Sequence, residues 1–182
     1  MPAYARVILG AAWIIWFARF VFARPTSRTP VQMDRRARWG LLLQAAGFFL
    51  VWWHESWNPE SAAWRVALSI IFFALAILLG WTSVRALGRH WRVDAGLDAD
   101  HQLVRAGPYR IIRHPVYASV LCMLLGTGFL ITPLPRLLLA TALGIAGTEI
   151  RVRIEDGLLA SRFGDEFREF QRSVSAYIPF LR

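Results

Sequence analysis

Lysine is absent from this chain: all 21 of its basic residues are arginine. This absence excludes a P-loop phosphate lysine, a pyridoxal Schiff base and a lysine general base. Cysteine is nearly absent, and the single Cys122 lies in an apolar run, which excludes a disulfide framework and a thiolate metal cluster. Charged residues make up 18% and hydrophobic residues 56% of the 182 residues. Such a composition is too apolar for an ordinary soluble domain and predicts one membrane domain over residues 1–182.

Five apolar segments are candidates for membrane spans, which need roughly 20 mostly apolar residues each. Charges such as Arg6 and Arg19 stand near the segment ends, where their side chains can reach the interface. No small-residue cleavage site follows the first segment, so we expect a retained span rather than a signal peptide. The predicted fold class is an all-α integral membrane protein with five transmembrane helices. The expected spans are about residues 3–23, 39–54, 64–86, 115–132 and 135–156.

The connections between these segments differ in charge. The first and third connections and the tail are rich in arginine. The second connection carries Glu55 and Glu60 and no basic residue, and the fourth is a tight turn at residues 132–135. Short arginine-rich loops stay in the cytoplasm. The alternation therefore predicts an N-terminus outside and a C-terminus in the cytoplasm.

The tail after the fifth segment has its apolar residues at helical spacing, with charged residues between them. This pattern predicts an amphipathic C-terminal helix that either lies on the membrane surface or packs as a lid over the cytoplasmic loop. The apolar positions are Phe163, Phe167, Phe170, Val174 and Tyr177.

A dense polar segment, residues 101–117, precedes the fourth span. Its Gly107-Pro108 pair predicts a turn, and Pro115 restricts His114 and opens the next helix. His114 would then lie at a helix N-terminus, where free amides favour an anion such as a carboxylate. Tyr109 and Tyr117 could stack on an aromatic base or close over a sulfonium. The alternative, of about equal weight from this segment alone, is a set of interfacial tyrosines with arginines bound to lipid headgroups.

A second polar cluster, residues 149–156, ends the fifth span. Helical spacing places Arg151 and Glu155 on one face, and Glu149, Arg153 and Asp156 on another. The second set is expected to form a structural ion-pair ladder. Arg151 could hold a substrate carboxylate in two parallel hydrogen bonds while Glu155 orients it, although a plain salt bridge within the helix is the commoner outcome of this spacing.

The polar motifs occur in a recognisable order. They are His101-x-Leu103-Val104, Gly107-Pro108-Tyr109, Arg113-His114-Pro115-x-Tyr117, Arg151-x-x-x-Glu155-Asp156 and Phe163-Gly164-x-Glu166-Phe167. This set resembles the isoprenylcysteine carboxyl methyltransferase family and, more distantly, the phospholipid methyltransferases. The five-span layout is similar to that of short prokaryotic members, which implies the inner membrane. Asp156 stands where the family usually has a second glutamate.

The resemblance implies a methyltransferase that uses S-adenosylmethionine, releases S-adenosylhomocysteine and has its active-site region at residues 90–170. Its acceptor would be the carboxylate of a lipophilic, isoprenylcysteine-like molecule that enters from the membrane. By position, Arg151 and Glu155 would be catalytic and face the acceptor. The implied cofactor-binding residues are His101, Gln102, Leu103, Val104, Tyr109, His114, Pro115, Val116 and Tyr117.

Other functions stay open at this stage. They are N-methylation of an amine or phospholipid headgroup, an NADPH-dependent reductase similar to sterol reductases, and a non-catalytic membrane protein whose arginines contact lipid. We expect no metal, because the spacing of His90, His101 and His114 matches no familiar site. We also expect no nucleic-acid partner, because the arginines are spread as topology determinants.

Overall fold

The fold is known from a computed structural model that describes residues 2–23, 32–53, 62–91, 96–97 and 102–179. Over these residues the regular structure is helical apart from two strands of two residues each, β1 (Gln32–Met33) and β2 (Gly96–Leu97), which pair antiparallel. Two short 3₁₀ segments, η2 (Gly88–His90) and η3 (Gly107–Arg110), belong to the long third connection. The α-helices are α1 (Ala3–Phe22), α2 (Ala37–Trp52), α3 (Ala63–Leu87), α4 (Pro115–Ile131), α5 (Leu134–Phe163) and α6 (Asp165–Ser173).

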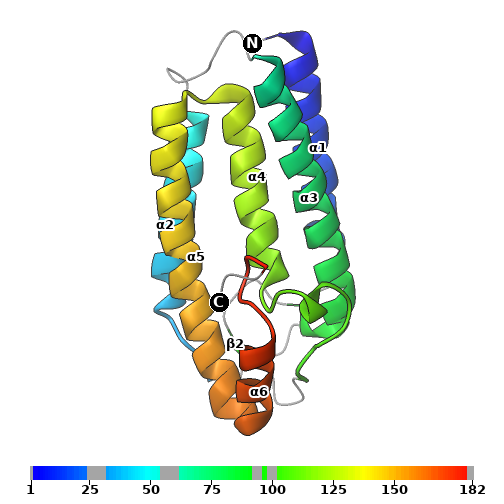
Figure 1. Cartoon of the computed structure of the whole chain (residues 1–182), viewed down its shortest axis with the longest axis vertical. Coiled ribbons are helices and arrows are strands. Elements are labelled where there is room, and N and C mark those ends of the chain that lie inside the picture. The colour runs from blue at the N-terminus through cyan, green and yellow to red at the C-terminus, as the bar shows by residue number, and fades with distance from the viewer. Residues whose placement is uncertain (1, 24–31, 54–61, 92–95, 98–101, 180–182) are drawn as a thin grey trace.

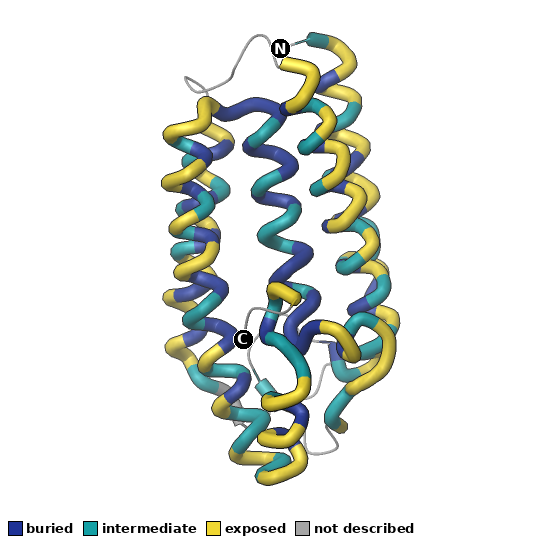
Figure 2. Tube along the Cα trace, viewed as in Figure 1, coloured by how far each residue is buried: buried dark blue, intermediate teal, exposed yellow. Residues whose placement is uncertain are grey.

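The helices α1 to α5 run side by side, with α4 in the middle, α3 and α1 on one side of it, and α5 and α2 on the other (Figure 1). Helix α4 is mostly buried, whereas the outer helices alternate buried and exposed positions (Figure 2). The β-strand pair, η2, η3 and α6 gather at one end of the bundle. This end carries the polar segments singled out in the sequence.

Two helical stretches, residues 3–22 and 63–90, are long and apolar enough to cross a membrane by length and composition. Helices α2 and α4 are apolar but shorter. Helix α5 begins apolar and continues through the charged residues 149–156 without a break. Large apolar side chains stand exposed on the outer helices, among them Ile14, Phe17, Leu42, Phe49, Ile71, Leu78 and Leu138.

Helices α2 and α5 cross at glycines. A β-carbon on Gly147 would lie 2.4 Å from the carbonyl oxygen of Gly40, and one on Gly40 would lie 2.5 Å from the carbonyl oxygen of Gly147. The two backbones therefore touch, as small residues allow in membrane proteins. Gly126 of α4 has a similar role against α3, since its missing side chain leaves room for the Phe73 ring.

Arg65, near the start of α3, is a buried charge that the sequence pattern did not single out. Its guanidinium donates to the carbonyls of Phe129 (2.8 Å), Gly128 (3.3 Å) and Thr132 at the end of α4. The last carbonyls of a helix lack partners within it, and a cation suits the negative end of the helix dipole. The Gly128 carbonyl also accepts from the backbone N–H of Thr132, at 2.9 Å. Arg65 thus caps α4 at the end of the bundle opposite the polar segments.

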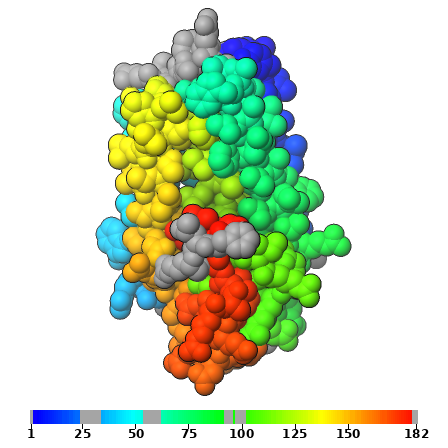
Figure 3. All heavy atoms as spheres, in the orientation of Figure 1, coloured from blue at the N-terminus to red at the C-terminus, as the bar shows by residue number. Residues whose placement is uncertain are grey.

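The chain turns back after α5 at Gly164, whose φ of 55° suits glycine, and forms α6. Phe167 and Phe170 on the inner face of α6 are buried. The segment that follows, residues 174–177, lies across the molecule between α5 and the loop before α4 (Figure 3). There the backbone N–H groups of Arg113 and His114 donate to the carbonyls of Ser175 and Ala176, both at 2.8 Å. We call residues 174–177 the C-terminal strap.

Candidate functional site

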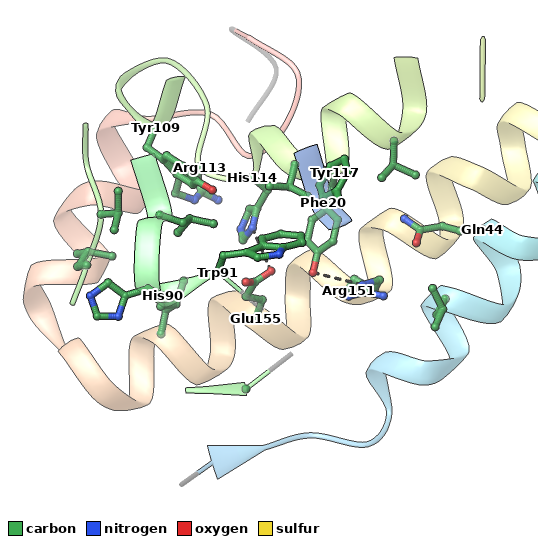
Figure 4. Close-up of a pocket in the computed structure, with 18 of the residues that line it drawn as sticks. Phe20, Gln44, His90, Trp91, Tyr109, Arg113, His114, Tyr117, Arg151 and Glu155 are labelled. Carbon is green, nitrogen blue, oxygen red and sulfur yellow. Dashed lines mark hydrogen bonds and ion pairs between the residues drawn. The ribbon is translucent and has the colours of Figure 1, made fainter. Parts of the chain in front are cut away.

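A cavity of about 530 Å³ lies at the polar end of the bundle and is lined by residues of α1, α2, α4, α5 and α6, by the last residue of α3 and by the third connection. Its polar lining includes His114, Arg151 and Glu155 (Figure 4), and aromatic residues of α1 and α2 contribute to its apolar lining. The apolar wall includes Trp13, Trp16, Phe17, Phe20, Leu41 and Phe48. A site of this size, mostly apolar with a few convergent polar groups, is typical of small-molecule binding.

His114 joins two carboxylates of α5. Its Nε2 lies 2.7 Å from Oδ1 of Asp156, and its Nδ1 lies 3.4 Å from Oε2 of Glu155. Pro115 starts α4 directly after it, as predicted, but the His114 amide is bonded to the C-terminal strap. The imidazole therefore faces the acidic pair of α5 and is not a ligand for a free anion.

The pKa of His114 reflects this arrangement. Burial opposes protonation, but the hydrogen bonds to Asp156 and Glu155 and their negative charges outweigh it and raise the pKa to about 9. The imidazolium is thus the stable form at neutral pH. Tyr109 has a pKa well above its usual value, because it is buried and lies near the charge of Glu155, so its phenol stays neutral.

Asp156 corrects one prediction. It was expected in a structural ion-pair ladder with Glu149 and Arg153, yet it is buried and binds Arg113 at 3.0 Å, His114 and the Gln171 side chain at 3.0 Å. The reason is that α6 and the C-terminal strap cover this face of α5. Arg113 reinforces the cover, since it also donates to the carbonyls of Gln171 and Val174.

The remaining ladder pair is present as predicted. Arg153 binds Glu149 at 2.8 Å on the exposed side of α5. The hydroxyl of Tyr177 in the strap also donates to Glu149, at 3.2 Å.

Arg151 is buried and lies in the cavity wall, one turn before Glu155 on α5. Its Nε donates to the hydroxyl of Tyr117 at 3.2 Å, and its guanidinium carbon lies 5.1 Å from the centre of that ring. Tyr117 stacks in turn on His114, with ring centres 5.7 Å apart. Imidazole, phenol and guanidinium therefore form one continuous wall.

The structure brings most of the predicted cofactor residues to this cavity. Those that line it are Gln102, Leu103, Val104, Tyr109, His114, Val116 and Tyr117, together with Arg151 and Glu155. Pro115 is buried beneath the wall as the first residue of α4. His101 lies outside the described residues.

Several lining residues were missed by sequence reasoning. Arg113 stands inside the quoted motif beside His114, so its position could have suggested it. Gln44 is the single uncharged polar residue of α2, and a polar group in an apolar helix is itself a signal of function. Trp91, Trp16 and Phe20 follow no motif, and their role depends on how the helices pack.

Comparison with known proteins agrees with this geometry. The sequence model of the family described as phospholipid methyltransferase matches residues 64–166. The chain belongs to the phospholipid methyltransferase family. The match covers α3, the third connection, α4 and α5, and so includes the elements that carry His114, Arg151 and Glu155.

Individual members of related families are similar to this chain at about 30% identity. The cobalt-zinc-cadmium resistance protein CzcN of Cupriavidus metallidurans is 31% identical over 134 residues, 72% of this chain and 57% of the relative. The protein-S-isoprenylcysteine O-methyltransferase of Tribolium castaneum is 30% identical over 123 residues, 65% and 43% of the two chains. That of Schizosaccharomyces pombe is 32% identical over 84 residues, 46% and 36%. The chain spans about half the length or less of these relatives.

Proposed function

We propose that this protein is an S-adenosylmethionine-dependent methyltransferase that methylates the carboxylate of a lipophilic acceptor. The observation that carries the proposal is one continuous cavity, polar around Arg151 and Glu155 and aromatic between α1 and α2. One half suits a charged donor and a carboxylate. The other half suits a lipid tail.

The residues present fit a sulfonium donor. The carboxylate of Glu155 and the ring of Trp91 line the cavity, and both anions and aromatic rings attract a cation. Bound there, S-adenosylmethionine would supply a methyl group whose carbon–sulfur bond breaks as the bond to the acceptor oxygen forms, with the electron pair staying on sulfur. Neutral Tyr109 could hydrogen-bond an uncharged part of the donor.

Arg151 is the proposed holder of the acceptor carboxylate. A carboxylate is ionised at neutral pH and needs no base, so the protein has to align it and exclude water. Tyr117 fixes the guanidinium by its hydroxyl and its ring face. Arg151 is therefore oriented before the acceptor arrives.

The membrane arrangement is part of the proposal. We infer that α1 to α5 all cross the bilayer, with the cavity at the cytoplasmic surface of a prokaryotic inner membrane. The 30 residues of α5 extend roughly 45 Å, whereas the apolar part of a bilayer is about 30 Å thick. The end of α5, with Arg151 to Asp156, then emerges at the interface. A lipid-tailed acceptor would enter from the membrane.

Binding of S-adenosylhomocysteine to the detergent-purified protein tests the donor site. We expect saturable binding, and Arg151→Gln should keep it while lowering kcat/KM for a carboxylate acceptor roughly 10- to 100-fold, as expected for lost hydrogen bonds to a charged group. Arg153→Gln is the matched control, because Arg153 lies on the exposed face of the same helix.

Three results would contradict the proposal. Equal turnover in Arg151→Gln and Arg153→Gln would contradict the role proposed for Arg151. Methyl transfer to amine acceptors but not to carboxylates would identify a headgroup N-methyltransferase. Thermal stabilisation by NADPH in place of S-adenosylhomocysteine would indicate a reductase.

A further inference from the structure

Gln44 is a buried amide in the middle of α2, with 6% of its surface exposed. Over Ala37–Trp52 the helix carries one charged residue, Arg38, near its start, and no other uncharged polar side chain besides Gln44. A buried amide in such a helix is costly unless it is hydrogen-bonded. Its position therefore needs an explanation beyond packing.

The glycine crossing places Gln44 beside the proposed acceptor site. Because Gly40 and Gly147 touch, the Gln44 backbone lies against Gly147, and a β-carbon on Gly147 would be 2.9 Å from its nitrogen. Gly147 is one helical turn from Arg151, whose side chain packs on Gly40. Helix α2 is thus held close enough to contribute to the same cavity, and Gln44 and Arg151 both line it (Figure 4).

The hydrogen bonding of Gln44 is incomplete. Its Nε2 donates to the hydroxyl of Thr148 at 2.9 Å, which fixes the side chain. An amide has two N–H donors and an oxygen acceptor. Within the part of the chain that the structure describes, the bond to Thr148 is the one hydrogen bond of the Gln44 side chain, and this side chain lines the cavity.

The order of groups along the cavity follows α5. Glu155 and Arg151 line it about one turn, or roughly 5 Å, apart. Thr148 follows Arg151 after about one more turn and binds Gln44, which also lines the cavity. Beyond it, Phe48 and Trp13 meet edge to face, with ring centres 5.6 Å apart. A molecule extended along the cavity would meet the guanidinium, then the Gln44 amide, then aromatic rings.

We propose that Gln44 determines acceptor specificity by binding an amide group that stands between the carboxylate and the lipid tail. The acceptor would then be an N-acylated or otherwise amide-linked amino acid, not a plain fatty acid. The inference rests on the proposed function, because Arg151 has to hold the carboxylate. Gln44 can donate its free N–H to the acceptor carbonyl or accept from its N–H.

The test compares two acceptors of matched chain length, N-dodecanoylglycine and the fatty acid in which methylenes replace its amide. We expect kcat/KM for labelled-methyl transfer to favour the amide compound in the wild type. In Gln44→Met, which keeps the side-chain length, this preference should fall roughly three- to tenfold, the worth of one neutral hydrogen bond. Affinity for S-adenosylhomocysteine should not change.

Thr148→Val is the matched control. It breaks the same Gln44–Thr148 bond, so a purely structural role predicts that both variants lose thermal stability and neither changes the acceptor preference. An unchanged acceptor preference in Gln44→Met, with normal S-adenosylhomocysteine binding and turnover, would contradict the role of Gln44 but not the proposed function. Failure of the wild type to bind S-adenosylhomocysteine would instead defeat the proposed function.

Discussion

His114 shows how one residue can tie two segments of the chain together. Both ring nitrogens meet carboxylates of α5, its backbone bonds the C-terminal strap, and its ring stacks on Tyr117. A neutral imidazole can donate from one nitrogen only, whereas the imidazolium donates from both. The geometry therefore requires the protonated form.

We predict a loss of stability at high pH that depends on this residue. The pKa of His114 is raised in the folded protein to about 9, so its stabilising effect is full below the usual value of about 6.5 and is lost as the pH rises through about 9. The thermal midpoint of the wild type in detergent should decline across this range. His114→Gln should start lower and decline less. Parallel pH profiles in the two proteins would show that His114 does not carry the charge.

Tyr117 and Gln44 illustrate different degrees of predictability among single residues. Tyr117 belongs to a motif, so its place in the site was predicted from the sequence, and its hydrogen bond to Arg151 follows from packing. Gln44 belongs to no motif, and only the crossing of α2 and α5 brings it to the cavity. Asp156 was placed wrongly, because helical spacing alone does not reveal which face a distant segment covers.

Among the elements, the helices were predicted closely. The expected segment 39–54 is observed as Ala37–Trp52, and 64–86 as Ala63–Leu87, because the length of each apolar run marks these ends in the sequence. The pairing of β1 with β2 and the strap were not predicted. Each joins short segments far apart in the chain, and their backbone hydrogen bonds leave no periodic pattern.

The crossing of α2 and α5 is the element contact most sensitive to substitution. Gly147→Ala would put a methyl group 2.4 Å from the Gly40 carbonyl, and neither backbone can move without separating the helices. We expect a cost of about 1–3 kcal/mol, seen as a lower thermal midpoint, together with weaker acceptor turnover.

Gly10→Ala on α1 serves as the control, since a β-carbon there meets nothing within 4 Å. It should leave stability unchanged or raise it by about 0.5–1 kcal/mol, the usual gain in helix propensity. If Gly147→Ala had the same thermal midpoint as Gly10→Ala, α2 and α5 would not approach each other as closely as described.

For the whole molecule, the proposed topology separates the two ends of the bundle by the membrane. Ala62, at the start of α3, and Gly157, on α5, lie at opposite ends and are both exposed. Single cysteines at these positions, in a Cys122→Ala background, report which end faces the cytoplasm. Gly157 tolerates a side chain because a β-carbon there would meet nothing within 4 Å.

We expect a membrane-impermeant maleimide to label Ala62→Cys in intact spheroplasts. Gly157→Cys should be labelled only after the membrane is opened. The reverse pattern would place the cavity on the outer surface. Labelling of both in intact cells would show that α3, α4 and α5 do not all cross.

The long sequence separation between α2 and α5 has a consequence for synthesis. Gln44 and its partner Thr148 are 104 residues apart. At about 5–20 residues per second, α2 would wait in the bilayer roughly 5 to 20 seconds before its partner is made. During that interval the Gln44 amide must be hydrogen-bonded by water, lipid headgroups or the insertion machinery. The part of the cavity between α2 and α5 is therefore completed only after the ribosome has finished α5, late in the biogenesis of the protein.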